Sequence, residues 1–486
     1  SNAWSCGGTA DCCRTSKRLT PLSKMTALAL DDIQGMILGG FNTDFQTMAA
    51  LTLVDPDRLA DALTWLAGLA PTITSVTMVK QTRDAIKDAA VADPPYWLGV
   101  AVGKRVVEGL RDLFIRDAAF NGGMVARGPS ILGDHSDAAT WTLGAINDPV
   151  DIFLIIGAND RAAAEAGADQ AVANAKASGL RLSYRETGVR LPGEREHFGF
   201  RDGISQPKVA GFDPGGVLGA GNFVFGYPAK AGGSPVLPVI DHRSLAPNGS
   251  LLVVRRLRQD VTAFHNFCSS EAKRIAGLWP GLTGDHLAAL IVGRWPSGAP
   301  VRMGVTQDPG GDPPSDEFDF REDPDASHCP FAAHIRKVNP RAGARDEVDV
   351  PRLLRRGLPF GLPEEEDHGL LFLAFQSSIP DQFEKLTRKW MNGAISPNPG
   401  NDLLVGRSLS ERTMNIIGPA GPIAISDGGK QWIEPTGGAY LFAPGKGALA
   451  RFGDSPTVSP LYGVQRFIAQ NLDRAAAMLS SAIGRH

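Results

Sequence analysis

The sequence predicts a mixed β-sheet covered by helices and spread over two or three domains. Three observations support this prediction. The chain has 486 residues, short β-rich runs alternate with helical stretches, and a segment rich in Gly and Pro interrupts that alternation. A domain holds about 100–200 residues, so this length suggests two or three domains. Alternating strands and helices favour a sheet with helices packed on it.

The first half of the chain carries the alternation most clearly. Apolar residues at helical spacing predict helices, and short apolar or β-branched runs predict strands. In order, we expect a strand at Met48–Val54, a helix at Pro56–Ala70, a strand at Tyr96–Val102, a helix at Lys104–Phe120, a strand at Val150–Ile156 and a helix at Arg161–Ser178.

The Gly/Pro-rich segment Ala210–Pro238 predicts a domain boundary. Two later stretches, Asp308–Asp325 and Asn392–Gly428, are expected to be long loops, which in compact domains are usually functional or mobile. In the second half the same criteria predict strands at Ser250–Arg256, Leu370–Gln376 and Ala439–Pro444, and helices at Asp285–Val292 and Asp381–Met391.

The composition is that of an ordinary globular enzyme. Hydrophobic residues make up 43% of the chain and charged residues 21%. The net charge of -3 gives no electrostatic reason to expect nucleic acid or an anionic membrane as a partner. The longest apolar run, Ile152–Ala158, is far shorter than the ~20 residues needed to cross a bilayer. We therefore expect small-molecule partners, with no nucleic acid and no membrane.

The first residues are not expected to form a folded element. Ser1-Asn2-Ala3 is typical of the remnant of an expression tag, and residues 4 to 24 are polar, without the apolar core of a secretory signal. We expect residues 1 to 24 to be a flexible leader or tag remnant. Because three of the five cysteines lie there, only Cys268 and Cys329 remain in the body. No disulfide framework is expected, and a cytoplasmic location is favoured.

A first candidate functional segment is residues 197 to 207, with the sequence HFGFRDGISQP. In it Asp202 stands between an arginine and Gly203, and glycines of this kind bring the backbone close to a bound group. An aspartate that caps its own turn is the more common interpretation of an Asp-Gly pair. The segment alone leaves both interpretations open.

A second candidate is residues 328 to 341, with the sequence HCPFAAHIRKVNPR. His334 lies at the expected start of a helix and could be an axial haem ligand, because a neutral imidazole binds iron. Two alternatives compete with this hypothesis. His334 could be a structural residue, or it could join His328 and Cys329 in a zinc site, although no fourth ligand at a zinc-ribbon spacing lies nearby.

A third segment begins at Arg355 with the sequence RRGLPFG and precedes the apolar run GLLFLAFQSS at residues 369 to 378. By itself, this pattern predicts a basic surface turn followed by a buried strand.

Taken together, these segments resemble the dye-decolorizing peroxidases. Residues 199 to 203 match the G-x-x-D-G motif of that family, and ISQP follows it as in the family. The resemblance runs from about Asp31 to Pro444 in the family's order, so it is far more specific than a lone G-x-x-D-G. The further similar stretches are DIQG at 32–35, FVFGYP at 223–228, LRQDV at 257–261 and VGRWPSG at 292–298.

The resemblance implies an α+β fold of two ferredoxin-like domains with antiparallel sheets flanked by helices. We expect an N-terminal domain at residues 25–215 and a C-terminal domain at 216–486 that holds haem b (iron protoporphyrin IX). The implied activity is that of a peroxidase from one of the larger bacterial or fungal-like subgroups. It would use hydrogen peroxide to oxidise dyes, phenols or similar organic reductants through a ferryl intermediate. An oligomer is compatible with the resemblance.

The resemblance also implies roles for individual residues. His334 matches the axial ligand of the haem iron, Asp202 matches the distal acid and Arg355 the distal arginine. Asp402, in the stretch GNDLLVG, resembles the acidic residue that hydrogen-bonds the proximal histidine. Leu403 departs from the family here, because related sequences often have Pro at that position.

Further residues complete the expected site. Leu370 and Phe372 resemble the apolar residues that line the distal pocket. The segment Gly203, Ile204 and Ser205 is expected to contact the cofactor. Bulky reductants would need an electron relay, although Trp and Tyr are more often packing residues than relays. Trp390 and Tyr440 are the main relay candidates, and Trp279, Trp295 and Tyr462 are others.

The sequence is also compatible with an alternative function. The same pocket would suit a protein that binds or handles haem without physiological peroxidase turnover. The presence of both Asp202 and Arg355 favours catalysis.

Overall fold

The computed structural model describes residues 27–87, 94–303, 306–310, 316–341 and 350–454. The expected leader at residues 1 to 24 lies outside the described residues.

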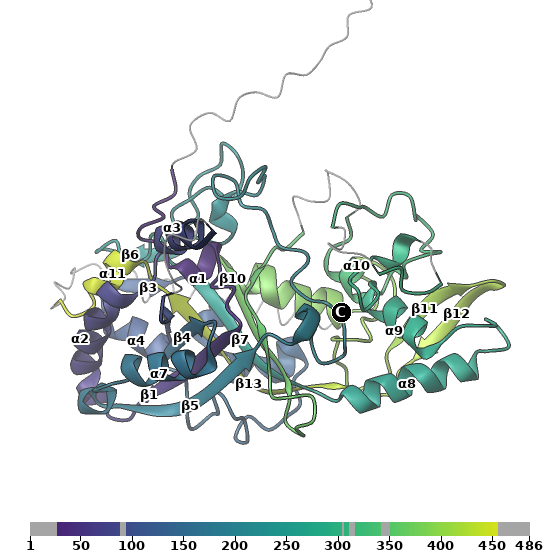
Figure 1. The fold of residues 1–486 in the computed structure, drawn as a ribbon. Helices are drawn as coiled ribbons and strands as arrows, with labels where there is room; N and C mark the ends of the chain where they lie inside the picture. The colour runs from purple at the N-terminus through teal and green to yellow at the C-terminus, as the bar shows by residue number, and fades with distance from the viewer. Residues whose placement is uncertain (1–26, 88–93, 304–305, 311–315, 342–349, 455–486) are drawn as a thin grey trace, which may run out of the picture.

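A single nine-stranded sheet runs through the molecule (Figure 1). Its order is β5-β1-β4-β2-β13-β7-β10-β8, and β9 pairs with β10 off this path. Every strand pair in this sheet is antiparallel, which corrects the expectation of a mixed sheet. The strands are β1 (Phe45–Leu53), β2 (Trp97–Val102), β4 (Ile152–Ala158), β5 (Leu180–Val189), β7 (Ser250–Gln259), β8 (Leu354–Arg355), β9 (Leu358–Phe360), β10 (Gly369–Gln376) and β13 (Ile433–Ala443).

The sheet consists of two halves, each with its own helices, and together they form the α+β, ferredoxin-like fold. Strands β5, β1, β4 and β2 come from the first half of the chain, and β13, β7, β10 and β8 come from the second. The halves join where Val102 of β2 pairs with Phe442 of β13. The α-helices are α1 (Gly35–Leu38), α2 (Leu59–Leu69), α3 (Val76–Lys87), α4 (Lys104–Gly109), α5 (Ala118–Gly122), α6 (Met124–Arg127), α7 (Arg161–Ala171), α8 (Val261–Arg274), α9 (Gly284–Val292), α10 (His334–Val338) and α11 (Lys446–Ala450).

Two core clusters lie on opposite faces of the sheet, because alternate residues of a strand point to opposite faces. In β10, Leu371, Leu373 and Phe375 belong to one cluster, whereas Phe372 packs against the other. The central strands β2 and β4 are buried along their whole length, which explains why apolar runs predicted both of them.

The single helix expected at Lys104–Phe120 is wrong. Helix α4 ends at Gly109, and Arg111 then adopts a left-handed backbone conformation with φ 57°. A short strand, β3 (Leu113–Ile115), pairs with β6 (Val239–Asp241) before helix α5 begins. Asp117 starts that helix by accepting hydrogen bonds from the backbone N–H groups of Ala119 and Phe120. Helical spacing of the apolar residues hid this break, since both helices bury residues in one core.

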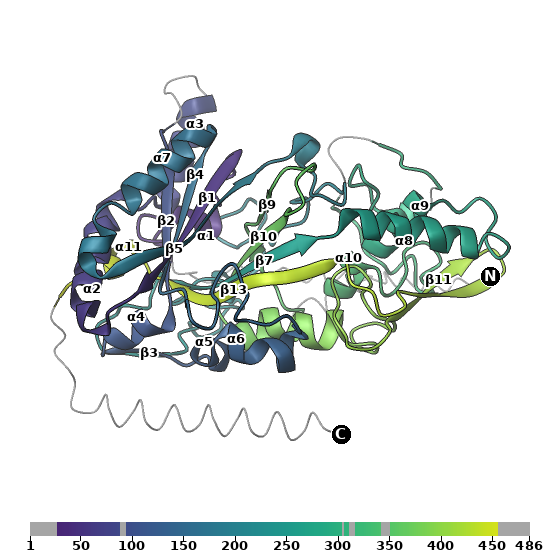
Figure 2. The same ribbon diagram turned by 90° about the horizontal axis from the view of Figure 1, so that it is seen from below.

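The loop expected at Asn392–Gly428 is also wrong in part, because it contains a hairpin of β11 (Thr413–Gly418) and β12 (Gly421–Ser426). Buried residues alternate with more exposed ones in both strands, a period-two pattern that the surrounding Gly and Pro residues obscured. Strand β5 and helix α8 were not predicted from the sequence. Figure 2 shows α8, α9 and β11 at one end of the molecule, far from α2 and α11.

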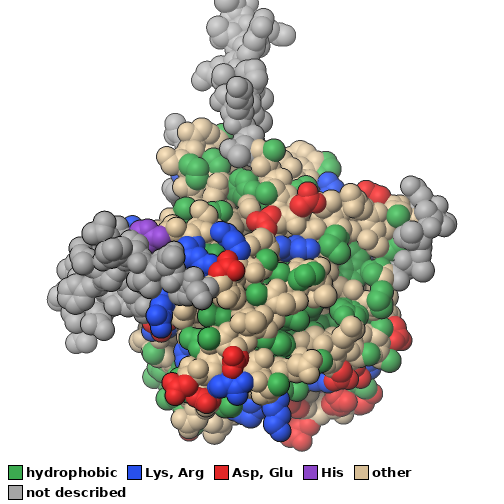
Figure 3. Space-filling model, turned by 90° about the vertical axis from the view of Figure 1, so that its left-hand side faces the viewer, with side chains coloured by type: hydrophobic (Ala, Val, Ile, Leu, Met, Phe, Trp, Pro, Cys, Tyr) green, Lys and Arg blue, Asp and Glu red, His purple; other side chains and the backbone are tan. Residues whose placement is uncertain are grey.

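The expected helix at Asp381–Met391 is found as two consecutive π-helical segments, η8 (Ile379–Glu384) and η9 (Leu386–Met391). Among the described residues, no helix combines the length and apolar character that a bilayer span requires. On the face drawn in Figure 3, acidic and basic side chains are interspersed, in keeping with the small net charge.

Candidate active site

The segment around Asp202 is tied to strand β8. Arg355 donates a hydrogen bond from Nη2 to the Ser205 carbonyl oxygen at 2.6 Å. Gln206 binds the backbone of Arg355 twice, accepting from its N–H and donating to its carbonyl oxygen, both at 3.2 Å. These contacts bring Arg355 Nη1 to 3.8 Å from Asp202 Oδ1. Asp202 and Arg355, which lie more than 150 positions apart in the sequence, therefore face each other in the fold.

Asp202 also takes part in its own turn, as the more common interpretation expected. Its Oδ1 accepts a hydrogen bond from the Gly203 N–H at 2.6 Å. Both glycines of the motif have positive φ, 92° at Gly199 and 76° at Gly203, a conformation that favours glycine. No hydrogen bond to Asp202 Oδ2 is found within the described part of the chain, and the side chain is 45% exposed. That oxygen is available to a ligand.

Glu196 holds the turn from within, and the sequence analysis missed it. Its carboxylate accepts hydrogen bonds from the backbone N–H groups of Phe198 and Phe200 and from the side-chain amide of Gln259. Burial raises the pKa of Glu196 to about 7, and the nearby charge of Asp202 contributes. The sequence signal for Glu196 was a carboxylate just before a glycine-containing turn, but its hydrogen-bond partners are visible only in the fold.

A cavity of about 760 Å³ opens beside Asp202 and Arg355. This volume suits a small molecule. Arg356 also lines this cavity, and burial lowers the pKa of its guanidinium to about 10. Guanidinium groups outnumber carboxylates around the cavity: Arg83, Arg190, Arg195, Arg201, Arg355 and Arg356 against Glu194, Asp202 and Asp213.

His334 begins helix α10, and its Nδ1 lies 2.7 Å from Asp402 Oδ2. Asp402 is fully buried, and its other oxygen, Oδ1, accepts hydrogen bonds from the N–H groups of Leu404 and Val405. A histidine held in this way through Nδ1 presents Nε2 outward. The pair that the sequence analysis expected is therefore in contact, despite Leu403 in place of Pro.

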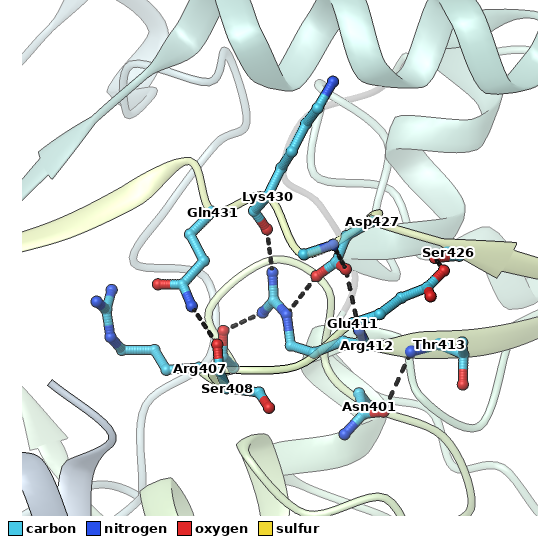
Figure 4. A network of polar contacts seen from close by, with 12 residues as sticks. Asn401, Arg407, Ser408, Glu411, Arg412, Thr413, Ser426, Asp427, Lys430 and Gln431 are labelled. Atoms are coloured by element: carbon cyan, nitrogen blue, oxygen red, sulfur yellow. Dashed lines mark hydrogen bonds and ion pairs between the residues drawn. The ribbon is translucent and has the colours of Figure 1, made fainter. Parts of the chain in front are cut away.

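Arg412 fixes the loop that carries Asp402 (Figure 4). Its guanidinium donates to the carbonyl oxygen of Asp402 at 3.1 Å and to that of Lys430 at 3.1 Å. It also forms an ion pair with Asp427, and both side chains are at most 2% exposed. This network was not predicted, because its members are brought together by the unexpected hairpin β11–β12.

The zinc interpretation of His328, Cys329 and His334 has no support in the site. His328 Nδ1 instead lies 3.4 Å from Asp323 Oδ1. Cys329 is buried, and burial raises the pKa of its thiol to about 12. No group of three or more His, Cys, Asp or Glu residues suited to a metal ion occurs in the described ranges.

Leu370 and Phe372 lie on one face of β10. Both are partly exposed, whereas Leu371 and Leu373 on the opposite face are fully buried. Arg355 pairs directly with Ala374 of β10, so its side chain leaves the sheet on the same face as Leu370 and Phe372. An incompletely covered apolar wall therefore lies beside the arginine of the site.

The remaining candidates are distributed more widely. Gly203 and Ile204 line the cavity, and Ser205 Oγ accepts a hydrogen bond from Arg341 at 3.2 Å. Trp390 on η9 and Tyr440 on β13 are both buried. Trp279 contacts the ring of His286 edge-on and Trp295 stacks on the same ring, which indicates packing. Tyr462 lies outside the described residues.

Comparison with known proteins gives one consistent answer. Residues 229–398 match the family model described as "Dyp-type peroxidase, C-terminal". The chain is 28% identical to Peroxidase 2 of Mycetinis scorodonius, over 90% of this chain and 89% of that protein. It is also 28% identical to the multifunctional dye peroxidase DyP2 of an Amycolatopsis species, over 86% of this chain and 94% of that protein.

Solved structures agree. A fungal DyP-type peroxidase from Auricularia auricula-judae superimposes with a TM-score of 0.72 at 26% identity, covering 88% of this chain and all of that one. A DyP-type peroxidase from Anabaena gives a TM-score of 0.71 at 26% identity, covering 87% and 94%. The fold and the comparisons define a peroxidase. Within that class, the chain is a peroxidase of the dye-decolorizing type.

Proposed function

We propose that this peroxidase binds haem b between His334 and the pair Asp202 and Arg355. His334 Nε2 would ligate the iron, and Asp202 and Arg355 would act on peroxide on the opposite, distal side. The observation that carries this assignment is the 2.7 Å contact between His334 Nδ1 and the fully buried Asp402. A buried carboxylate on the second ring nitrogen is the usual partner of a metal-binding histidine.

The residues present fit a haem group. Haem needs one imidazole nitrogen, an apolar wall and a polar group above the iron. His334 supplies the first, with its side chain 25% exposed in an otherwise packed region. The open face of β10 with Leu370 and Phe372 supplies the second. Gly203, Ile204 and Ser205 would border the cofactor next to Asp202.

The bound haem supplies an iron that binds hydrogen peroxide and accepts oxidising equivalents from it. Asp202 Oδ2 would take a proton from one peroxide oxygen and return it to the other, so that the O–O bond can break and water can leave. Arg355 is a permanent cation and would stabilise negative charge as the O–O bond breaks. Ionised Asp402 would hold the Nδ1 proton of His334 and make the imidazole a stronger electron donor.

The catalytic groups come from both parts of the chain. With a domain boundary near residue 215, Asp202 belongs to the N-terminal domain, whereas Arg355 and His334 belong to the C-terminal one. Contacts of Arg355 with Ser205 and Gln206 support a distal site assembled across that boundary. We propose the domains as residues 25–215 and 216–486.

Organic reductants such as dyes and phenols would donate electrons at the cavity beside Asp202 or through an aromatic relay. The cavity volume of about 760 Å³ supports entry of a small phenol. Trp390 and Tyr440 are the relay candidates for donors too large to enter, and their burial requires that electrons rather than substrates reach them.

The test is the visible absorption spectrum of haem-loaded protein before and after one equivalent of hydrogen peroxide. We expect a Soret band that shifts with peroxide in the wild type and that is lost or altered in His334→Ala. His328→Ala is the matched control, because His328 lies on the same segment and is exposed. Its spectrum should equal that of the wild type.

Two results would contradict the proposal. An unchanged spectrum in His334→Ala would exclude His334 as the iron ligand. A Soret band that does not respond to peroxide in the wild type would instead favour haem handling without turnover.

A further inference from the structure

A phenol and a carboxylate face each other inside the core beneath the sheet. Tyr440 on β13 donates a hydrogen bond from its hydroxyl to Glu384 Oε1 at 3.0 Å. Tyr440 is 4% exposed and Glu384 is 3% exposed. A buried carboxylate is costly unless it is paired, so its presence in an apolar core calls for a functional or structural reason.

Arg127 holds Glu384 in place. Its Nε donates to Glu384 Oε1 and its Nη2 to Oε2, both at 2.6 Å. The carboxylate is therefore fixed in a two-pronged ion pair and also accepts a hydrogen bond from the Tyr440 hydroxyl. Asp117 lies close enough for its charge to interact with that of Glu384, and its pKa is raised to about 6, chiefly by burial. The ion pair with Arg127 is complete without Tyr440, and the buried Tyr440 hydroxyl has this charged carboxylate as its hydrogen-bond acceptor.

Aromatic rings connect Tyr440 with the expected distal wall. The rings of Tyr440 and Phe383 lie 6.3 Å apart, and those of Phe383 and Phe372 lie 6.0 Å apart. All three pack in the same core cluster. Phe372 is the partly exposed residue of β10 that is expected to border the cofactor. Two ring contacts therefore connect the redox-active phenol of Tyr440 with Phe372, on the face of β10 where the cofactor is expected.

We propose that Tyr440 and Glu384 form a proton-coupled redox pair that stores one oxidising equivalent of the peroxidase reaction. This inference rests on the proposed function, because the peroxide-oxidised cofactor is the oxidant. Tyr440 would give one electron to the cofactor, reducing it by one equivalent, and the O–H proton would pass to Glu384 Oε1. The products are a neutral phenoxyl radical and a neutral carboxylic acid.

The step is reversible and releases no atom. A phenolic reductant that supplies one electron through the cofactor would restore Tyr440, and Glu384 would return the proton. Oxidation makes a phenol proton strongly acidic, so a base in hydrogen-bond contact is required. At rest the proton stays on oxygen, because burial raises the pKa of Tyr440 well above its ordinary value.

The chain offers a matched control pair. Tyr184 on β5 donates a hydrogen bond to Glu186 Oε2 and is also buried. Tyr184 belongs to the other core cluster, on the opposite face of the sheet from Phe372 and Phe383. The Tyr184–Glu186 pair therefore tests a buried tyrosine–glutamate contact that lacks the ring contacts to Phe383 and Phe372.

The experiment treats haem-loaded protein with one equivalent of hydrogen peroxide, without reductant, and freezes it within milliseconds for electron paramagnetic resonance. We expect a tyrosyl signal in the wild type and in Tyr184→Phe, and a signal at least tenfold smaller in Tyr440→Phe. Glu384→Gln should also lose the signal, because an amide cannot accept the proton. Circular dichroism checks that each variant is folded; Tyr440→Phe leaves the ion pair with Arg127 intact.

The outcomes separate this inference from the proposed function. If peroxide leaves the Soret band of the wild type unchanged, the proposed function fails. If the band shifts but Tyr440→Phe keeps the full tyrosyl signal, the redox pair is wrong. If Tyr440→Phe loses the signal and a folded Glu384→Gln keeps it, Glu384 is not the proton acceptor.

Discussion

The two sides of the proposed haem site are built differently. On the distal side, Asp202 and Arg355 are 45% and 36% exposed and lie 3.8 Å apart. On the proximal side, Asp402 is fully buried and lies 2.7 Å from the ring of His334. The ligand side is thus fixed by packing and hydrogen bonds, while the side that must admit peroxide is left open. A site of this kind combines a rigid support with access for substrate.

The largest effect is expected from the open side. Asp202→Asn should lower kcat/KM for hydrogen peroxide by about 10²–10⁴-fold, because the amide cannot accept a proton and general acid–base groups contribute that much. Since Asp202 is exposed, the melting temperature should not change. Steady-state kinetics with a phenolic donor measure the effect. Glu194→Gln, which alters another carboxylate of the same cavity, should keep near wild-type activity; equal losses in both variants would refute the acid role.

On the proximal side, a substitution should lower the free energy of unfolding. Arg412→Met leaves Asp427 as a buried charge without its partner. Breaking a buried ion pair from one side typically costs about 3–5 kcal/mol. Denaturant unfolding measures this loss. The control is Arg258→Met, which removes an exposed pair with Glu434 and should cost at most about 1 kcal/mol. Similar losses in the two variants would show that the Asp402 loop does not depend on Arg412.

The turn beneath Asp202 should make stability depend on pH. The pKa of Glu196 is raised to about 7 in the folded protein, so folding favours its protonated form. Its stabilising contribution is full below pH ~4.5 and is lost as pH rises to about 7, where the folded-state group ionises. Glu196→Gln should reduce the decrease in unfolding free energy across this range by about 1–3 kcal/mol. An unchanged pH profile in this variant would show that another group is responsible.

The smallest effect should come from the apolar wall. Leu370→Ala should change kcat/KM for a bulky phenol by roughly tenfold or less, because a single apolar side chain in a pocket controls selectivity by only ~1–3 kcal/mol. Turnover of hydrogen peroxide itself should stay the same when a small donor is used. Parallel assays with a small and a bulky phenol measure the difference. A loss with both donors would indicate that Leu370 positions the cofactor instead.

Local sequence patterns predicted the fold where strands are wholly apolar, as in β2 and β4, because burial on both faces leaves a continuous run. They failed between Lys104 and Phe120, where Arg111 adopts a positive φ after the first helix and the short strand β3 precedes the second. The family motifs predicted Asp202, Arg355 and His334 as site residues, and the hydrogen bond expected between His334 and Asp402 is found. Glu196 and Arg412 escaped, since their importance comes from backbone groups that only folding brings within reach.

The junction of the two half-sheets has a consequence for synthesis of the chain. Strand β2 ends at residue 102, but its neighbour β13 begins only at residue 433. During translation the N-terminal half therefore presents an unpaired strand edge while more than three hundred further residues are made. Open edges of this kind pair readily with other chains. Chaperone protection of nascent chains should therefore matter most in this interval, before the last strand is released from the ribosome.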